Sequence, residues 1–236
     1  MNIQSVELVI SYITLALAYV IAVTLSGSFK AWVARFFGDD TAESLGLLTL
    51  NPFAHIDFMG GLFLIVFGFG WGRNVPINPY KINNRFHKLK IALAYFSNSF
   101  AHLVMASVTL VLLVFIFGVK ILYLAIPMIY TGELLQSQFV SVYPDASSIA
   151  ISLGLIGIAL MFLNVLLAVL DFIISVFGLG AFVVLEHSPS YTRYRDILMI
   201  IIPMLMIYFF INPLRLLVVR VLLFMGLILA QLFGGM

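Results

Sequence analysis

Four side chains in this sequence combine metal-binding chemistry with apolar surroundings: His55, Asp57, His102 and Asp171. Imidazole nitrogens and carboxylate oxygens are the usual zinc ligands when thiolates are missing. Cysteine is absent from the chain, which excludes thiolate ligands and disulfides. A metal site built from these four residues is therefore one hypothesis.

The alternative is that intramembrane polar side chains join helices to one another. His102 follows Asn98 by one helical turn, and such a pair more often hydrogen-bonds across a helix interface than binds a metal. Asn164 is a further amide inside an apolar run. A carboxylate such as Asp171 costs about 2.5 to 3.5 kcal/mol at the centre of a membrane helix, so we expect it to face the helix bundle or to be protonated. Lys30 is its candidate partner.

The elements that must position these side chains are membrane helices. Hydrophobic residues make up 63% of the 236 residues and charged residues only 9%. A soluble domain carries roughly a quarter charged residues, so this chain lacks the polar surface to cover itself in water. Lipid cannot hydrogen-bond a free backbone, and the long, non-alternating apolar runs therefore predict helices that span a bilayer.

We predict an all-α integral membrane protein with about six transmembrane or re-entrant helices and a small membrane-associated β element at about residues 47–82. The apolar segment 58–70 is too short to span a membrane and is rich in glycine, so we expect it to be re-entrant. The run 149–185 is too long for one span and too short for two, so we expect a break inside the membrane near Gly178 and Gly180. The long apolar runs are 8–25, 91–119, 149–185, 197–211 and 221–233.

The distribution of charge predicts the orientation. Residues 70–91 contain five basic residues and no acid, whereas residues 130–148 contain two acids and no base. The positive-inside rule places the first segment in the cytoplasm and the second outside. We expect a single domain over residues 1–236 in a prokaryotic inner (plasma) membrane, with the lipid bilayer as its environment and no nucleic-acid partner; the oligomeric state is left open.

Three closely spaced motifs carry a family resemblance. The chain reads G-D-D-T-A at 38–42, G-L-L-T-L-N-P at 46–52 and H-I-D-F-M-G at 55–60. This resembles the site-2 protease family of intramembrane zinc metalloproteases, whose members run G-D-x-T-A, G-R-L-T-L-N-P and H-I-D-x-x-G. The resemblance covers roughly residues 20–106 well. Its motif positions that are not zinc ligands are expected to be structural, namely Gly38, Asp39, Asn51, Pro52, His55 and Asp57.

The family's zinc site departs from this sequence. Family members use H-E-x-x-H, in which two histidines on one helix face bind zinc and the glutamate is the general base. The first histidine lies twelve residues before the glycine of G-D, so the three positions fall on Ser26, Gly27 and Lys30. A hydroxyl, a missing side chain and an ammonium group cannot replace them.

The family's third ligand is an aspartate on a later, broken helix. Aligning Asn164, Ala168 and Gly180 with the family pattern places Leu179 at this aspartate. A shifted alignment would place Asp171 there instead, but it needs a gap and loses the match at Gly180. No catalytic residue and no metal ligand remain in the first alignment, and zinc is expected to be absent.

The resemblance therefore implies a non-catalytic pseudoprotease that binds or regulates a membrane-protein client or a protease partner. Two alternatives stay open: an active intramembrane metalloprotease with a substituted metal site, acting in regulated intramembrane proteolysis, or a structural subunit of a membrane complex. In the family, the substrate joins a membrane-embedded sheet as an added strand. The alternating segment Val75, Pro76, Ile77 and Asn78 is the expected client-binding strand, since proline suits an edge.

Overall fold

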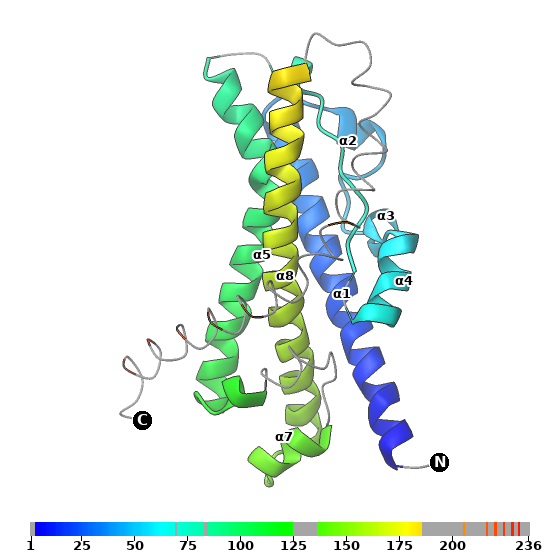
Figure 1. The fold of residues 1–236 in the computed structure, drawn as a ribbon, viewed down its shortest axis with the longest axis vertical. Helices are drawn as coiled ribbons and strands as arrows, with labels where there is room; N and C mark the ends of the chain where they lie inside the picture. The colour runs from blue at the N-terminus through cyan, green and yellow to red at the C-terminus, as the bar shows by residue number, and fades with distance from the viewer. Residues whose placement is uncertain are drawn as a thin grey trace.

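The computed structural model describes residues 3–68, 70–82, 85–124 and 136–185, together with six isolated positions between residues 205 and 231. Three long helices dominate these residues: α1 (Ile3–Phe36), α5 (His87–Phe117) and α8 (Ser148–Leu185). They lie side by side, with α5 antiparallel to α1 and α8 (Figure 1). Each is long and apolar enough to cross a membrane, so the chain is a helical membrane protein.

Close packing holds the three helices together. Gly157 of α8 allows α5 to approach, because a Cβ there would lie only 2.7 Å from the Leu113 side chain. Since lipid tails are as apolar as these side chains, van der Waals contact and interhelical hydrogen bonds supply the association energy. The largest fully buried apolar side chains of this core include Leu110, Ile158, Met161, Leu163 and Leu167.

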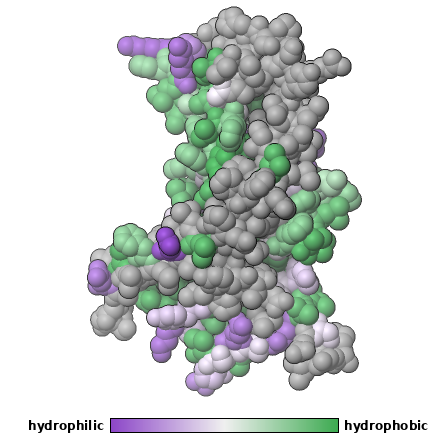
Figure 2. Space-filling view, viewed as in Figure 1, coloured by the Kyte–Doolittle hydropathy of each residue, from purple (hydrophilic) through white to green (hydrophobic). Residues whose placement is uncertain are grey.

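The outward-facing side chains are apolar as well. Phe115 of α5 is 83% exposed, and many other large apolar side chains of the three helices are uncovered. In Figure 2 hydrophobic side chains cover much of the described surface, and hydrophilic ones gather toward its two ends. A lipid bilayer is the environment that suits such a surface.

The prediction of six membrane segments is not supported by the described residues. They contain three candidate spans and one shorter apolar helix, α4 (Phe58–Phe67). The predicted spans 197–211 and 221–233 lie outside the described residues, apart from isolated positions.

The break predicted near Gly178 and Gly180 is wrong, because α8 is one continuous helix of 38 residues. At about 1.5 Å per residue it is far longer than the apolar core of a bilayer, so the extra length can project beyond the membrane. Two glycines without proline weaken a helix but do not interrupt it.

The predicted β element is also not supported. Within the described part of residues 47–82 there is no strand, and only an isolated antiparallel bridge joins Ile56 to Gly72. These residues instead form α3 (Pro52–His55), α4 and the 3-10 turn η1 (Pro79–Lys81), and the short helix α2 (Thr41–Ser44) precedes them. A strand needs a partner ladder, and in the described chain none lies beside Val75–Asn78.

Helix α4 and the chain that follows it form a tight return. The bridge between Ile56 and Gly72 brings the two ends of this excursion together. The Tyr19 hydroxyl of α1 donates to the Trp71 carbonyl at 2.8 Å and fixes the return against α1. Figure 1 shows α4 alongside α1. The two backbones cross at Gly60 and Gly70, where an added Cβ would lie 1.9 and 2.0 Å from a carbonyl oxygen of the opposite backbone.

The crossing predicts a sharp difference between two adjacent glycines. We expect Gly60→Ala to lower the free energy of unfolding by about 1 to 3 kcal/mol or more, because the new methyl group must displace backbone. Gly61→Ala is the matched control, since nothing lies within 4 Å of its added Cβ. Thermal unfolding in detergent measures both variants, and equal midpoints would contradict the crossing.

Candidate functional site

Three of the four positions that the family uses for catalysis lie near the C-terminal end of α1. Ser26 is buried and its hydroxyl points back to the Val23 carbonyl at 3.4 Å. Gly27 is also buried. The fourth position, Leu179 of α8, packs against an apolar cluster that contains Val33 and Ile91. In chain order, the four positions therefore carry a hydroxyl group, no side chain, an ammonium group and an alkyl group.

The ring of His55 lies directly against Gly27. His55 is the last residue of α3 and is 0% exposed. Its Nε2 donates to the Thr49 carbonyl at 2.8 Å, and the Ser28 hydroxyl lies 3.1 Å from the same nitrogen. Because a carbonyl only accepts, Nε2 must carry a proton. Nδ1 is buried without a hydrogen-bond partner.

A second polar cluster lies between α5 and α8. His102 Nδ1 lies 2.7 Å from Asn164 Oδ1, and Asn98 Nδ2 donates to Asp171 Oδ2 at 2.6 Å. His102 Nε2 lies 3.3 Å from the same carboxylate oxygen. The structure thus brings together all four predicted intramembrane polar residues, and it gives them interhelical hydrogen bonds.

The hydrogen bonds in this cluster fix where its protons can be. Asn164 Nδ2 donates to the Leu160 carbonyl at 2.8 Å, so its Oδ1 must accept from His102 Nδ1. His102 therefore uses Nδ1 as a donor to α8, while its Nε2 faces the carboxyl group of Asp171.

Lys30 lies within electrostatic range of Asp171. The direct partners of that carboxylate, however, are Asn98 and His102. The expected pairing of Lys30 with Asp171 is thus an attraction between α1 and α8 rather than a hydrogen-bonded ion pair. The Lys30 side chain is partly exposed.

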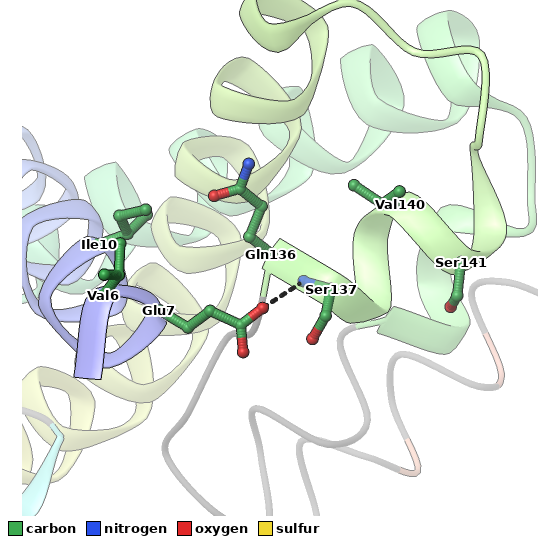
Figure 3. Close-up of a pocket in the computed structure, with 7 residues that line it drawn as sticks. All are labelled: Val6, Glu7, Ile10, Gln136, Ser137, Val140 and Ser141. Atoms are coloured by element: carbon green, nitrogen blue, oxygen red, sulfur yellow. Dashed lines mark hydrogen bonds between the residues drawn. The ribbon is translucent and has the colours of Figure 1, made fainter. Parts of the chain in front are cut away.

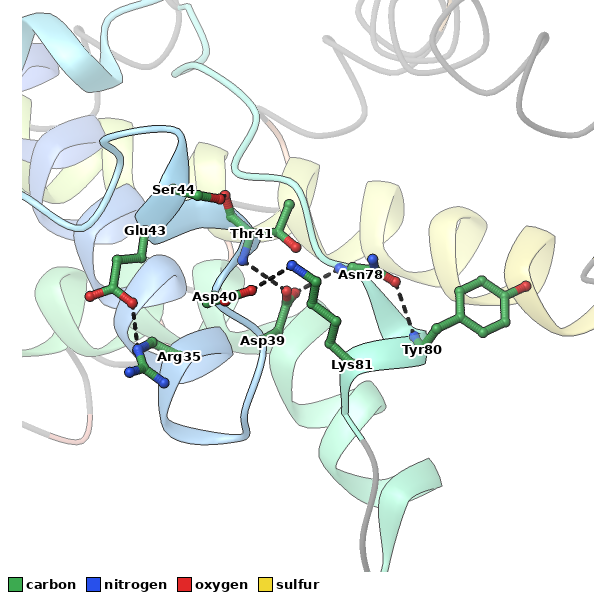
Figure 4. Close-up of polar contacts among 9 residues, drawn as sticks. All are labelled: Arg35, Asp39, Asp40, Thr41, Glu43, Ser44, Asn78, Tyr80 and Lys81. Atoms are coloured by element: carbon green, nitrogen blue, oxygen red, sulfur yellow. Dashed lines mark hydrogen bonds and ion pairs between the residues drawn. The ribbon is translucent and has the colours of Figure 1, made fainter.

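A third set of polar contacts joins the end of α1 to residues 78–81 (Figure 4). Asp39 is 0% exposed, and its carboxylate accepts from the backbone N–H groups of Thr41 at 3.0 Å and Asn78 at 2.6 Å. Gly38 precedes it with φ +101°, a conformation that favours glycine. These contacts hold the start of η1 close to the end of α1, and they give Gly38 and Asp39 structural roles.

The neighbouring contact of Asp40 with Lys81 is exposed to solvent. The Lys81 ammonium lies 2.5 Å from the Asp40 carboxylate. This hydrogen bond lowers the pKa of Asp40 from its ordinary value of 3.8, and the same bond raises the pKa of Lys81 from 10.5. Arg35 and Glu43 form a similar surface pair at 2.5 Å. Exposed pairs of this kind contribute little to stability.

Two other motif residues cap helices. The Asn51 side chain accepts from the backbone N–H of Phe53 at the start of α3, where Pro52 occupies the first turn. The Asp57 side chain accepts from the backbone N–H of Gly60 at 2.8 Å and begins α4. Both residues therefore have a local structural role as helix N-caps.

The side chains in the described part of the chain do not fit a zinc site with three protein ligands. Among the described residues, no group of three or more His, Cys, Asp or Glu side chains gathers closely enough to hold a metal ion. His55 and Asp57 act separately, one as a buried ring beside Gly27 and the other as a helix cap. His102 and Asp171 are neighbours, but their closest companions are amides.

The expected client-binding strand is not a free edge. Val75 is buried in a cluster with Ala31, Ala42 and Leu47. The backbone N–H of Asn78 is taken by Asp39. Pro76 and Ile77 lie between these two anchored residues, so a client strand would have to displace existing contacts before pairing here.

A hollow of about 590 Å³ lies at the opposite end of the molecule, between the start of α1 and α7 (Gln136–Val142). Figure 3 shows the Glu7 carboxylate beside the N-terminus of α7, where it accepts from the backbone N–H of Ser137 at 3.0 Å. At about 1.5 Å per residue of α1, it is some 30 Å from Lys30 and has no connection with the family positions.

Sequence reasoning missed several hydroxyl groups that complete these clusters. Ser99 donates to the Ala168 carbonyl at 2.6 Å, and Ser175 donates to the Tyr95 carbonyl at 2.7 Å. Ser175 lies one turn after Asp171, so helical spacing from the aspartate could have found it. The roles of Ser28 and Thr49 beside His55 left no comparable signal, because they depend on how two distant segments meet.

The chain is similar to a known metalloprotease-like protein over part of its length. Over 64 residues it is 44% identical to the Bacillus subtilis (strain 168) protein named "Putative zinc metalloprotease YwhC". That likeness supports a relationship to metalloproteases. The match covers 27% of this chain and 29% of that protein, so the chain matches less than a third of its relative's length. No family model and no solved structure matches the chain.

Proposed function

We propose that this chain is a site-2 protease-like pseudoprotease of a prokaryotic inner membrane, which binds or regulates a membrane-protein client or partner without cutting it. The observation that carries the proposal is the set of groups at the four family positions, Ser26, Gly27, Lys30 and Leu179. Catalysis of this type needs three protein ligands for zinc and a base for its bound water. Here the four positions supply one weak ligand, no base and a cation.

The surroundings of these positions support the same conclusion. Zinc needs its ligands within about 2 to 2.3 Å of one point. Leu179 is packed among apolar side chains, and Ser26 turns its hydroxyl to its own helix. What remains is a membrane fold with a large lipid-facing apolar surface, which is suited to contacts with other transmembrane segments.

We expect the full-length protein, purified in detergent, to contain well under one zinc ion per chain by elemental analysis. A family protease with an intact H-E-x-x-H motif, purified in parallel, should retain its zinc and serves as the control. We also expect no cleavage of transmembrane substrates after addition of zinc.

The alternative of an active protease with a substituted site draws on the zinc metalloprotease name of the relative. It requires near-stoichiometric metal and cleavage that a chelator abolishes. If metal were found, its loss in His102→Ala would locate the site at the α5–α8 cluster. Near-stoichiometric metal in the parent protein, or cleavage that a chelator abolishes, would overturn the pseudoprotease proposal.

A further inference from the structure

We propose that the His55 imidazole occupies the space next to residue 27 where the missing base would lie. The stability of this packing then depends on both the glycine at residue 27 and the histidine at residue 55. The inference rests on the proposed function, because it concerns the position where family members carry the catalytic glutamate. The imidazole ring fills the space into which any side chain at residue 27 would extend. The site is therefore closed by the chain's own fold and needs no bound partner to close it.

The distances at Gly27 leave no room for a side chain. A Cβ added there would lie 2.4 Å from His55 Nδ1 and 3.2 Å from both Cε1 and Cγ of the same ring. All three atoms belong to the Nδ1 side of one rigid imidazole. In this chain a glutamate at residue 27 would overlap the ring in its present position. Family members that carry both this glutamate and the histidine of H-I-D must therefore hold the ring elsewhere.

The ring and the backbone that carries it are each held in place. Nε2 is fixed by the Thr49 carbonyl and lies beside the Ser28 hydroxyl. The backbone carbonyl of His55 accepts from the backbone N–H of Arg73 at 2.7 Å, next to the bridge between Ile56 and Gly72. Turning the ring away would therefore break the buried hydrogen bond of Nε2, and shifting the whole residue would break the bond to Arg73.

The buried Nδ1 gives an independent sign that this contact is specific. It has no hydrogen-bond partner and lies against Gly27. An unpartnered buried polar atom costs free energy, so another ring position would be favoured unless packing selected this one. Packing against a residue without a side chain explains how the ring can remain there.

A double-mutant cycle in the full-length protein tests the inference. The variants are Gly27→Ala, His55→Ala and the pair together, and the readout is the apparent midpoint of thermal unfolding in detergent. We expect Gly27→Ala alone to lower the midpoint by about 2 to 12 °C, from an overpacking cost of about 1 to 3 kcal/mol. Removing the ring first should make the same methyl group harmless, so the double variant should be clearly more stable than additivity requires.

Gly180→Ala is the matched control, because Gly180 is also a helical glycine and nothing lies within 4 Å of its added Cβ. We expect its midpoint to stay at or slightly above that of the parent. Additive effects at residues 27 and 55, or a Gly27→Ala variant as stable as Gly180→Ala, would overturn the inference. If Gly27→Ala does not accumulate, recovery of folded protein in the double variant supports the inference, and failure of both variants overturns it.

The cycle and the zinc measurement can fail separately. Zinc bound to the parent protein together with strong coupling would refute the pseudoprotease proposal and leave the contact of His55 with Gly27 in place. A zinc-free parent with additive variants would leave the pseudoprotease proposal in place and refute the coupling of His55 with Gly27.

Discussion

Replacing Asp39 by alanine is expected to lower the free energy of unfolding by about 3 to 5 kcal/mol. The buried carboxylate accepts two backbone N–H groups, from Thr41 and from Asn78. Hydrogen bonds to a charged group contribute about 1.5 to 3 kcal/mol each, and their loss would leave buried donors unpaired. The segment from Gly70 to Lys81 would lose an anchor to the end of α1.

Asp40→Ala is the control, since the two aspartates are adjacent and differ in exposure. Chemical unfolding in detergent at pH 7 should place Asp40→Ala close to the parent and Asp39→Ala far below it. Similar losses for both would show that burial of the carboxylate is not what matters. Asp39→Asn should fall between the parent and Asp39→Ala, because the amide oxygen can still accept one of the two N–H groups.

The exposed pair of Asp40 with Lys81 also gives a pH dependence of known sign. The pKa of Asp40 is lowered in the folded state, so its contribution is present above pH 3.8 and is lost as the pH falls further. The pKa of Lys81 is raised, so its contribution is present below pH 10.5 and is lost as the pH rises through the folded pKa. Between these limits the pair should add no pH dependence.

Substitution of Asp171 by alanine is expected to cost about 2 to 4 kcal/mol. The change removes the acceptor of Asn98 Nδ2 and the partner of His102 Nε2. Single interhelical hydrogen bonds in membranes average only about 0.6 kcal/mol, but two polar groups that lose their partner in a buried cluster cost more than one lost bond. The Asp171 side chain is 18% exposed, which limits the loss.

The measured quantity is the unfolding free energy in a detergent titration, with Ser152→Ala of α8 as the control. Ser152 is exposed and bonds only to its own helix, so its removal should be nearly neutral. A second cycle with Asp171→Asn and Lys30→Met measures the attraction between α1 and α8. Coupling near zero would mean that Lys30 does not contribute through Asp171.

The sequence by itself determined the membrane character, three of the spans and the chemistry of the family positions. Long apolar runs are sufficient for the first two, because a bilayer acts on each segment through its own composition. Counting from Gly38 identified Ser26, Gly27 and Lys30 without any knowledge of the fold. The sequence also predicted that the polar residues of α5 and α8 would bond across helices, because a buried polar group in lipid needs a partner.

Only the tertiary structure decided which partners meet. His55 lies against Gly27 although 28 residues separate them in the chain, and Asn98 meets Asp171 across 73 residues. It also decided that α8 is unbroken and that Val75–Asn78 is not a strand. Local hydropathy fixes whether a segment enters the bilayer. The rotation of each helix and the route of the return after α4 depend on contacts between distant segments, which no local pattern encodes.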